Sequence, residues 1–381
     1  MRSGKTCSAI ALIVALFVVP SVARAGTLLD GFRDSSDGQF DMSDWLLTKK
    51  GALVVPVVIT EPAIGYGGGL GVAFFHQSVQ ERAAESAAKG DGKMEPPSIS
   101  AAVGMATENG TWAGGAGHFG SWKDDRFRYL GGAGYFAPKL DYYGGGGTLP
   151  PISYELEGWG IIQELSARMG KSDLFAGARL IYADITGRLD IDKPGLPERD
   201  SDVALGGAAA FFNWDSRDNI LTPTRGVNAM LRATMFGEAL GSDRNFELYD
   251  SYAQIYLKPH PRLVTGLRLD ARSSSGDTPF YAKPYLQMRG LPAMRYSDDV
   301  TALVEAELRW NVKGRWSLVG FGGTGRVGNE FGDLGDADAV NAYGTGFRYL
   351  LARRLGLQGG IDIGFGPDDT AWYIQVGNAW R

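Results

Sequence analysis

The chain has 381 residues, of which 44% are apolar and 21% charged, and it contains 55 glycines. With 38 basic and 43 acidic residues, its formal net charge of −5 gives no electrostatic reason to expect binding to nucleic acid. The apolar content is too high for a disordered chain. One cysteine excludes a disulfide framework and a thiolate zinc site. The three histidines are far apart in sequence, so we expect no metal centre and no cofactor.

The first residues have the features of a secretory signal peptide. Arg2 and Lys5 give a basic start, residues 9–19 are apolar, and Ala-Arg-Ala at 23–25 has the small-x-small form that signal peptidases cut. The apolar run is shorter than the roughly 20 residues that a membrane-spanning helix needs. We therefore expect a signal peptide at 1–25. Because no second long apolar run follows, the exported chain is either soluble in the periplasm or inserted as a β-barrel.

Residues 26–50 form a short polar lead-in that contains Phe32, Phe40 and Trp45. Two interpretations stay open for it: a disordered tail, or a segment that lies in or under the lumen of a barrel. In either case we expect a short periplasmic segment, with no room for an independent folded domain before the first strand.

A period of two decides between the soluble protein and the barrel. Residues 304–313 alternate strictly, with Val304, Leu308 and Trp310 on one face and Glu305 and Glu307 on the other. Comparable segments recur along the chain, each about ten residues long or a little longer, as a tilted bilayer-crossing strand requires. We place sixteen of them, at 51–60, 66–77, 98–108, 111–122, 126–137, 152–168, 174–189, 202–213, 227–237, 246–257, 262–273, 300–313, 315–327, 341–352, 355–365 and 371–380.

The connections between these segments alternate between short and long. The predicted inner turns are short, whereas the outer loops at 190–202, 274–299 and 328–340 are longer, which is typical of outer-membrane barrels. The exception is a long polar insertion at 78–97 on the inner side. A soluble sandwich or propeller also alternates, but it rarely carries so many charges opposite aromatic residues. The sequence therefore predicts an all-β fold over 51–381, a sixteen-stranded antiparallel transmembrane barrel of the bacterial outer membrane.

Two motifs indicate a resemblance to a known family. Residues 214–226 read WDSRDNILTPTRG at the turn after the eighth predicted strand, and residues 287–296 read QMRGLPAMRY in the longest outer loop. Together they resemble the barrel of the BamA/TamA superfamily, also called the bacterial surface antigen family. Two further segments are similar to the compact branch of this superfamily, which lacks the periplasmic POTRA domains. They are residues 53–71 at the start of the barrel, LVVPVVITEPAIGYGGGLG, and residues 106–112, ATENGTW.

The resemblance implies a role in insertion, translocation or surface display of outer-membrane proteins. It implies outer-membrane lipid, the barrel-assembly machinery, unfolded client proteins or a separate periplasmic protein as partners. The alternative is a passive pore or small-solute channel, which a charged lumen also suits. We expect no enzymatic activity, since no nucleophile–base arrangement can be identified and the histidines are not visibly placed beside a serine.

The inner-turn motif combines charge with restricted backbone. Pro223 fixes φ, and Gly226 permits the positive φ at which the next strand begins. The favoured interpretation is a rigid hairpin with local ion pairs. The motif residues are Asp215, Arg217, Asp218, Asn219, Pro223 and Gly226.

The outer-loop motif comprises Arg289, Gly290, Arg295 and Tyr296. A guanidinium presents a planar fork of donors that fits a carboxylate, and a glycine allows close approach to a wall. The resemblance implies that Arg289 enters the lumen and pairs with an acid on the wall, with Glu307 as the best candidate and Glu305 beside it. The family's second acid would fall at Gly323, so we expect a weaker pairing between Arg289 and the barrel wall.

The C-terminal segment 372–381 resembles the terminal-strand signal that the barrel-assembly machinery reads. It ends with Trp380 and Arg381, where the family usually ends in an aromatic residue. From its physical chemistry, we expect Trp380 to anchor the last strand at the membrane interface.

Overall fold

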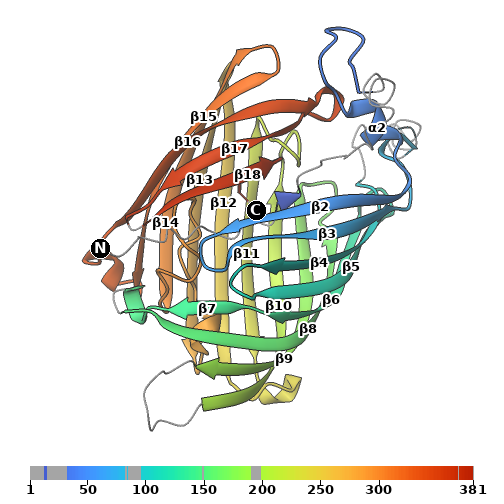
Figure 1. Ribbon diagram of the computed structural model, residues 1–381. Helices are drawn as coiled ribbons and strands as arrows, with labels where there is room; N and C mark the ends of the chain where they lie inside the picture. The colour runs from blue at the N-terminus through green and yellow to red at the C-terminus, as the bar shows by residue number, and fades with distance from the viewer. Residues whose placement is uncertain are drawn as a thin grey trace.

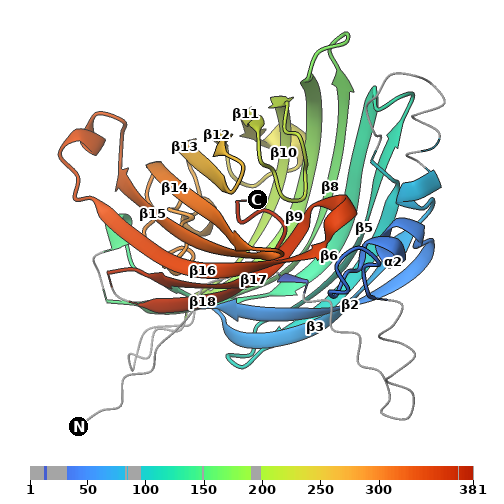
Figure 2. The ribbon, with the colours of Figure 1, turned by 90° about the horizontal axis from the view of Figure 1, so that it is seen from above.

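The computed structural model describes residues 13–14, 32–81, 84, 96–147, 150–189, 199–367 and 369–380. They form one antiparallel sheet that curls into a nearly closed barrel (Figures 1 and 2). The long strands are β2 (Gly51–Glu61), β3 (Gly65–Phe75), β4 (Ile99–Thr107), β5 (Trp112–Trp122), β6 (Phe127–Ala137), β8 (Ile152–Arg168), β9 (Leu174–Leu189), β10 (Arg199–Asp215), β11 (Gly226–Phe236), β12 (Phe246–His260), β13 (Leu263–Gly276), β14 (Val300–Lys313), β15 (Trp316–Gly328), β16 (Val340–Ala352), β17 (Leu357–Phe365) and β18 (Thr370–Val376).

Short elements accompany these strands. They are the strands β1 (Ile13–Val14) and β7 (Lys139–Tyr142), the helix α2 (Ser43–Thr48), and the 3-10 turns η1 (Gly145–Gly147), η2 (Glu238–Leu240), η3 (Phe280–Ala282), η4 (Asp333–Gly335) and η5 (Arg353–Leu355). Among the described residues, no helix is long and apolar enough to cross a membrane. The predicted all-β fold with a sixteen-stranded antiparallel barrel is confirmed. Apart from Ile13–Val14, the predicted signal peptide lies outside the described residues.

The two faces of each strand differ as the alternation predicts. On β14, Glu305 is buried toward the lumen, whereas Leu308 and Trp310 are 54% and 52% exposed on the outer wall. The cross-strand register carries this separation around the sheet, because Val304 is paired with Leu269 of β13. The outer wall is therefore apolar and the lumen charged.

The two ends of the barrel also differ. We call the end that carries α2 and the short turns the inner end, and the opposite one the outer end. The connection between β3 and β4 lies at the inner end, where Glu81 contacts Lys50 at 3.2 Å. This agrees with the predicted long insertion on the inner side, although its residues 82–83 and 85–95 lie outside the described part of the chain. The longest outer connection, residues 277–299, is called the lumen loop below.

The barrel has a seam between its first and last long strands, β2 and β18, which adjoin each other (Figure 1). Every other neighbouring pair of long strands shares a register of at least seven residue pairs, as β17 and β18 do over Gly359–Phe365 and Thr370–Val376. At the seam, the described residues form no such ladder. Instead, β1 pairs with β2 through Ile13 with Val58 and Val14 with Val57.

Candidate functional site

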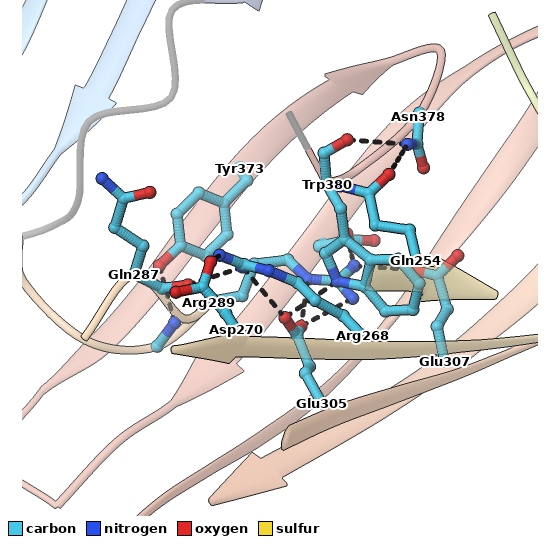
Figure 3. Close-up of polar contacts among 12 residues, drawn as sticks. Gln254, Arg268, Asp270, Gln287, Arg289, Glu305, Glu307, Tyr373, Asn378 and Trp380 are labelled. Atoms are coloured by element: carbon cyan, nitrogen blue, oxygen red, sulfur yellow. Dashed lines mark hydrogen bonds and ion pairs between the residues drawn. The ribbon is translucent and has the colours of Figure 1, made fainter. Parts of the chain in front are cut away.

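The lumen loop carries Arg289 into the barrel, where its side chain is 7% exposed (Figure 3). Nε and Nη2 donate hydrogen bonds to Glu305 Oε1 at 3.1 and 2.9 Å. Nη1 lies 2.8 Å from Glu307 Oε2, an ion-pair contact without hydrogen-bond alignment. The guanidinium also stacks 3.7 Å from the centre of the Phe321 ring. The structure thus brings Arg289 to both predicted acids, with Glu305 as the hydrogen-bonded partner instead of the favoured Glu307.

A third acid, missed by the sequence analysis, completes the pairing. Arg289 Nη1 donates to Asp362 Oδ2 of β17 at 2.9 Å, and Arg348 Nη2 of β16 donates to the same oxygen at 2.8 Å. Asp362 is fully buried. The expectation that Arg289 lacks a second acid on the wall is therefore wrong, because that acid is present on β17 and not on β15. The alternation Ile361-Asp362-Ile363, with its single inward charge, is the sequence signal that could have identified it.

Gly290 brings the lumen loop against the wall near the seam. Its φ of +100° is strained for any side chain, and a Cβ there would lie 3.1 Å from the backbone of Phe365. Its N–H donates to the Tyr373 hydroxyl of β18 at 2.7 Å. A few residues on, the N–H of Ala293 donates to Glu61 Oε1, at the end of β2, at 3.3 Å. The lumen loop is therefore bonded to both seam strands.

The other two residues of the loop motif hold the loop itself. Arg295 stacks on the ring of Tyr143, with 4.0 Å between the guanidinium carbon and the ring centre. The carbonyl of Tyr296 accepts a hydrogen bond from Leu286 N at 2.9 Å, and its ring packs on a cluster that contains Leu286 and Met288. These two residues stabilise the conformation that presents Arg289.

The C-terminal residues lie inside the barrel, which contradicts the expected interfacial anchor. β18 ends at Val376, and Trp380, only 4% exposed, lies in the lumen (Figure 3). Its Nε1 donates to Glu305 Oε2 at 2.8 Å, so one carboxylate binds both the lumen loop and the chain end. Asn378 bonds to the Tyr256 hydroxyl at 3.0 Å. The tail turns inward because its polar groups find partners in the charged lumen.

The inner-turn motif has the predicted local contacts. Asp215 and Arg217 form an ion pair at 2.7 Å, and Gly226 has a φ of +105°. Asp218 accepts hydrogen bonds from the backbone of Thr224 at 2.8 Å and of Arg225 at 3.1 Å. Burial raises the pKa of Asp218, but the hydrogen bond from the Thr224 hydroxyl and these backbone hydrogen bonds together outweigh burial and leave the pKa below its ordinary value.

The same turn also reaches strands far from it in sequence. Asn219 Nδ2 donates to the carbonyl of Leu355 at 2.7 Å, and Arg309 Nη2 of β14 donates to the carbonyl of Pro223 at 2.6 Å. The hairpin therefore has long-range contacts in addition to its local ion pair. The turn braces the inner end of the lumen against β14 and η5.

The described part of the lead-in begins at Phe32 and lies at the inner end against the turns of β14–β15 and β16–β17. Arg315, between β14 and β15, is bonded to Asp34 at 2.7 Å, to Asp37 at 2.9 Å and to Asp41 at 2.6 Å. Hydrogen bonding to Asp37 is the largest cause that raises the pKa of Arg315. Of the two open interpretations, the described part of the lead-in fits a docked segment and not a disordered tail.

Two of the three histidines meet on the outer wall, which the sequence analysis did not anticipate. Ser100 Oγ lies 2.9 Å from His76 Nε2 and 2.9 Å from His118 Nδ1, and the two rings are 5.3 Å apart. Ser100 is paired across the strands with Phe74, which is 46% exposed on the outer wall. Among the described residues, no group of three or more possible metal ligands is found.

The comparisons with solved structures support the fold. BamA from Haemophilus ducreyi lacking POTRA domains 1–3 superposes with a TM-score of 0.60 and 10% identity, covering 86% of this chain and 70% of that chain. CdiB from Acinetobacter baumannii has a TM-score of 0.52 and 11% identity over 85% of this chain, and CdiB from Escherichia coli 0.59 and 10% over 86%. This chain has the barrel fold of BamA and CdiB. It spans 59% and 62% of the two CdiB chains. By sequence, no protein-family profile and no curated protein matches it.

Proposed function

We propose that this protein is an outer-membrane barrel that acts in insertion, translocation or surface display of other outer-membrane proteins, with the β2–β18 seam as its working site. The seam carries this proposal. Every other long-strand pair shares an extended ladder, whereas at the seam the described residues that pair with β2 are Ile13 and Val14 of β1. Both lie in the predicted signal peptide, so its removal leaves this edge of β2 open. An unpaired strand edge binds extended chains through its backbone groups, which is the chemistry needed to template a client strand.

The outer wall supports a membrane location. Trp112 and Trp122 stand 46% and 41% exposed at opposite ends of β5, as interfacial aromatic residues do. Outer-membrane lipid is then the partner of this wall, and the barrel-assembly machinery the route of insertion. The clients are unfolded outer-membrane proteins, delivered directly or by a separate periplasmic protein.

The arrangement of the lumen favours this role over a passive pore. The Arg289 network and the Trp380 tail occupy the lumen, and the inner turn crosses toward β14 at the inner end. A pore needs a continuous aqueous path, which such packing obstructs. Planar-bilayer recordings separate the two roles, since a pore conducts steadily and a seam insertase of this kind stays closed at rest.

Reconstitution tests the proposal directly. Liposomes that contain the protein should fold an unfolded barrel client faster than empty liposomes. The matched control joins the seam, with cysteines at Ala52 and Ile374 linked by a bifunctional maleimide, and should lose the acceleration while the unlinked variant keeps it. Equal rates in empty and protein-containing liposomes would contradict the proposal.

A further inference from the structure

The lead-in crosses beneath the seam. α2 is followed directly by Lys49 and Lys50 and then by β2, the first seam strand. Yet the lead-in packs on the opposite side of the seam, where buried Met42 lies against Ala352 and Leu357, with Val376 at the end of β18 beside them. With so short a connection, the inner end of β2 cannot move away from β16–β18 unless the lead-in leaves its place.

Arg315 holds the lead-in by charge. Its side chain is 2% exposed, and its guanidinium is shared among Asp34, Asp37 and Asp41. It also donates to the carbonyl of Phe40 at 3.0 Å. Removing one partner from a buried ionic cluster leaves the others uncompensated, so the contact is held or lost as a unit.

Backbone hydrogen bonds fix the same segment on η5 and the end of β16. Met42 N donates to the carbonyl of Leu351 at 2.7 Å, and Arg353 N donates to Asp41 Oδ2 at 3.1 Å. Arg354 pairs with Asp44 of α2 at 2.6 Å. The rings of Phe32 and Trp45, 6.0 Å apart, cover the apolar part of this contact. Ion pairs, backbone hydrogen bonds and apolar packing thus hold the lead-in in the same docked position.

We infer that residues 32–48 form a clasp that holds the seam closed at the inner end, with Arg315 as the residue that fastens it. The lumen loop joins the two seam strands within the barrel, through Tyr373 and Glu61, so the seam is fastened at two places. Separation of β2 from β18 requires release of the clasp. The clasp itself does not depend on the proposed function. Only the purpose of seam opening, the folding of client proteins, rests on it.

Distances across the seam test the clasp. The chain's one cysteine, Cys7, lies in the predicted signal peptide, so spin labels at Ala52→Cys and Ile374→Cys report on β2 and β18 alone once the signal is removed. We expect one narrow distance distribution in the parent and an added longer-distance population in Arg315→Ala. The isosteric variant Asp34→Asn/Asp37→Asn/Asp41→Asn should give the same added population.

Arg168→Ala is the matched control. Arg168 lies with Asp125 in another carboxylate cluster at the inner end, at the β5–β6 and β8–β9 turns, and does not contact the lead-in. It should leave the distribution unchanged. Retention of the heat-modifiable gel shift shows that each variant is folded. Unchanged distances in both folded clasp variants would overturn the inference. If the distances lengthen in these variants but the protein does not accelerate client folding in liposomes, the clasp is retained and the proposed function is refuted.

Discussion

Asp362 of β17 provides Arg289 with the carboxylate that Gly323 of β15 lacks. A Cβ at Gly323 would lie 2.6 Å from Met288 Sδ, so the lumen loop itself fills the space in which an acid on β15 would stand. Asp362 reaches the same guanidinium from the strand next to β18 and binds Arg348 as well. The acid that pairs with Arg289 opposite β14 thus stands on β17, which connects the pairing to the seam side of the barrel.

Asp362→Asn tests this connection. The substitution keeps the shape but leaves two buried guanidiniums with one carboxylate fewer, and we expect a loss of about 3–5 kcal/mol in the free energy of unfolding. Urea titration followed by the heat-modifiable gel shift measures it. Asp250→Asn, which removes the partner of Arg232 where both side chains are about one-fifth exposed, should lose about 1 kcal/mol or less. Equal losses in the two variants would contradict a special role for Asp362.

Trp380 offers a second test, because its ring and its N–H act separately. Trp380→Phe keeps most of the packing on Tyr256 but removes the hydrogen bond to Glu305, which we expect to lower stability by about 1–3 kcal/mol. Trp380→Ala also removes the buried ring and should lose about 3–5 kcal/mol. If Trp380 were an outward anchor without the bond to Glu305, Trp380→Phe would unfold like the parent in the same urea titration.

The sequence predicts the parts of this molecule that follow from periodicity. Alternation alone locates the strands, because an inward charge such as Glu305 and an outward Trp310 are separated by the pleat. What it cannot give is contact between distant strands. Asp362 bonds to Arg289 across 73 positions, and Asn219 reaches Leu355 across 136, and neither pairing follows from a local pattern.

The same reason explains the misplaced chain end and the histidines. Trp380 looks like an anchor from its neighbours in sequence, and only closure of the barrel places Glu305 beside it. His76 and His118 become neighbours through the registers of β3, β4 and β5, which bring both to Ser100.

The pH dependence of the clasp follows from its carboxylates. The hydrogen bond to Arg315, which exists only in the docked position, lowers the pKa of Asp37. The pKa of Asp34 is lowered first by hydrogen bonds from Ser36 within the lead-in itself, and only further by the charges of Arg353 and Arg315. A group whose pKa is lower when docked stabilises docking above its ordinary pKa, about 3.9, and this stabilisation is lost as the pH falls through the lowered value.

We therefore expect the clasp to stay docked from pH 8 to pH 5 and to release only as the pH falls below about 4. Spin labels at Thr48→Cys on α2 and Lys171→Cys on the β8–β9 turn measure the docking distance at each pH. A change between pH 8 and pH 5 would show that other groups hold the segment.

Ser100 provides the sharpest test of the expectation from the sequence that the protein has no enzymatic activity. A serine beside an imidazole is the start of a nucleophile–base pair, and here Ser100 has two such neighbours at 2.9 Å. Catalysis further needs an orienting group for the base and donors for the oxyanion. Within the described part of the chain, neither His76 nor His118 contacts a carboxylate, and the backbone donors of β4 and β5 serve their ladder.

We therefore expect a fluorophosphonate probe to leave Ser100 unmodified in the folded protein, as mass spectrometry of the digested barrel can establish. Ser100→Ala should then release no more or less fatty acid from phospholipid micelles than the parent. Labelling of Ser100 in the parent that disappears in His118→Asn would reverse this conclusion. Both results together require that His118 acts as a base that activates the Ser100 hydroxyl.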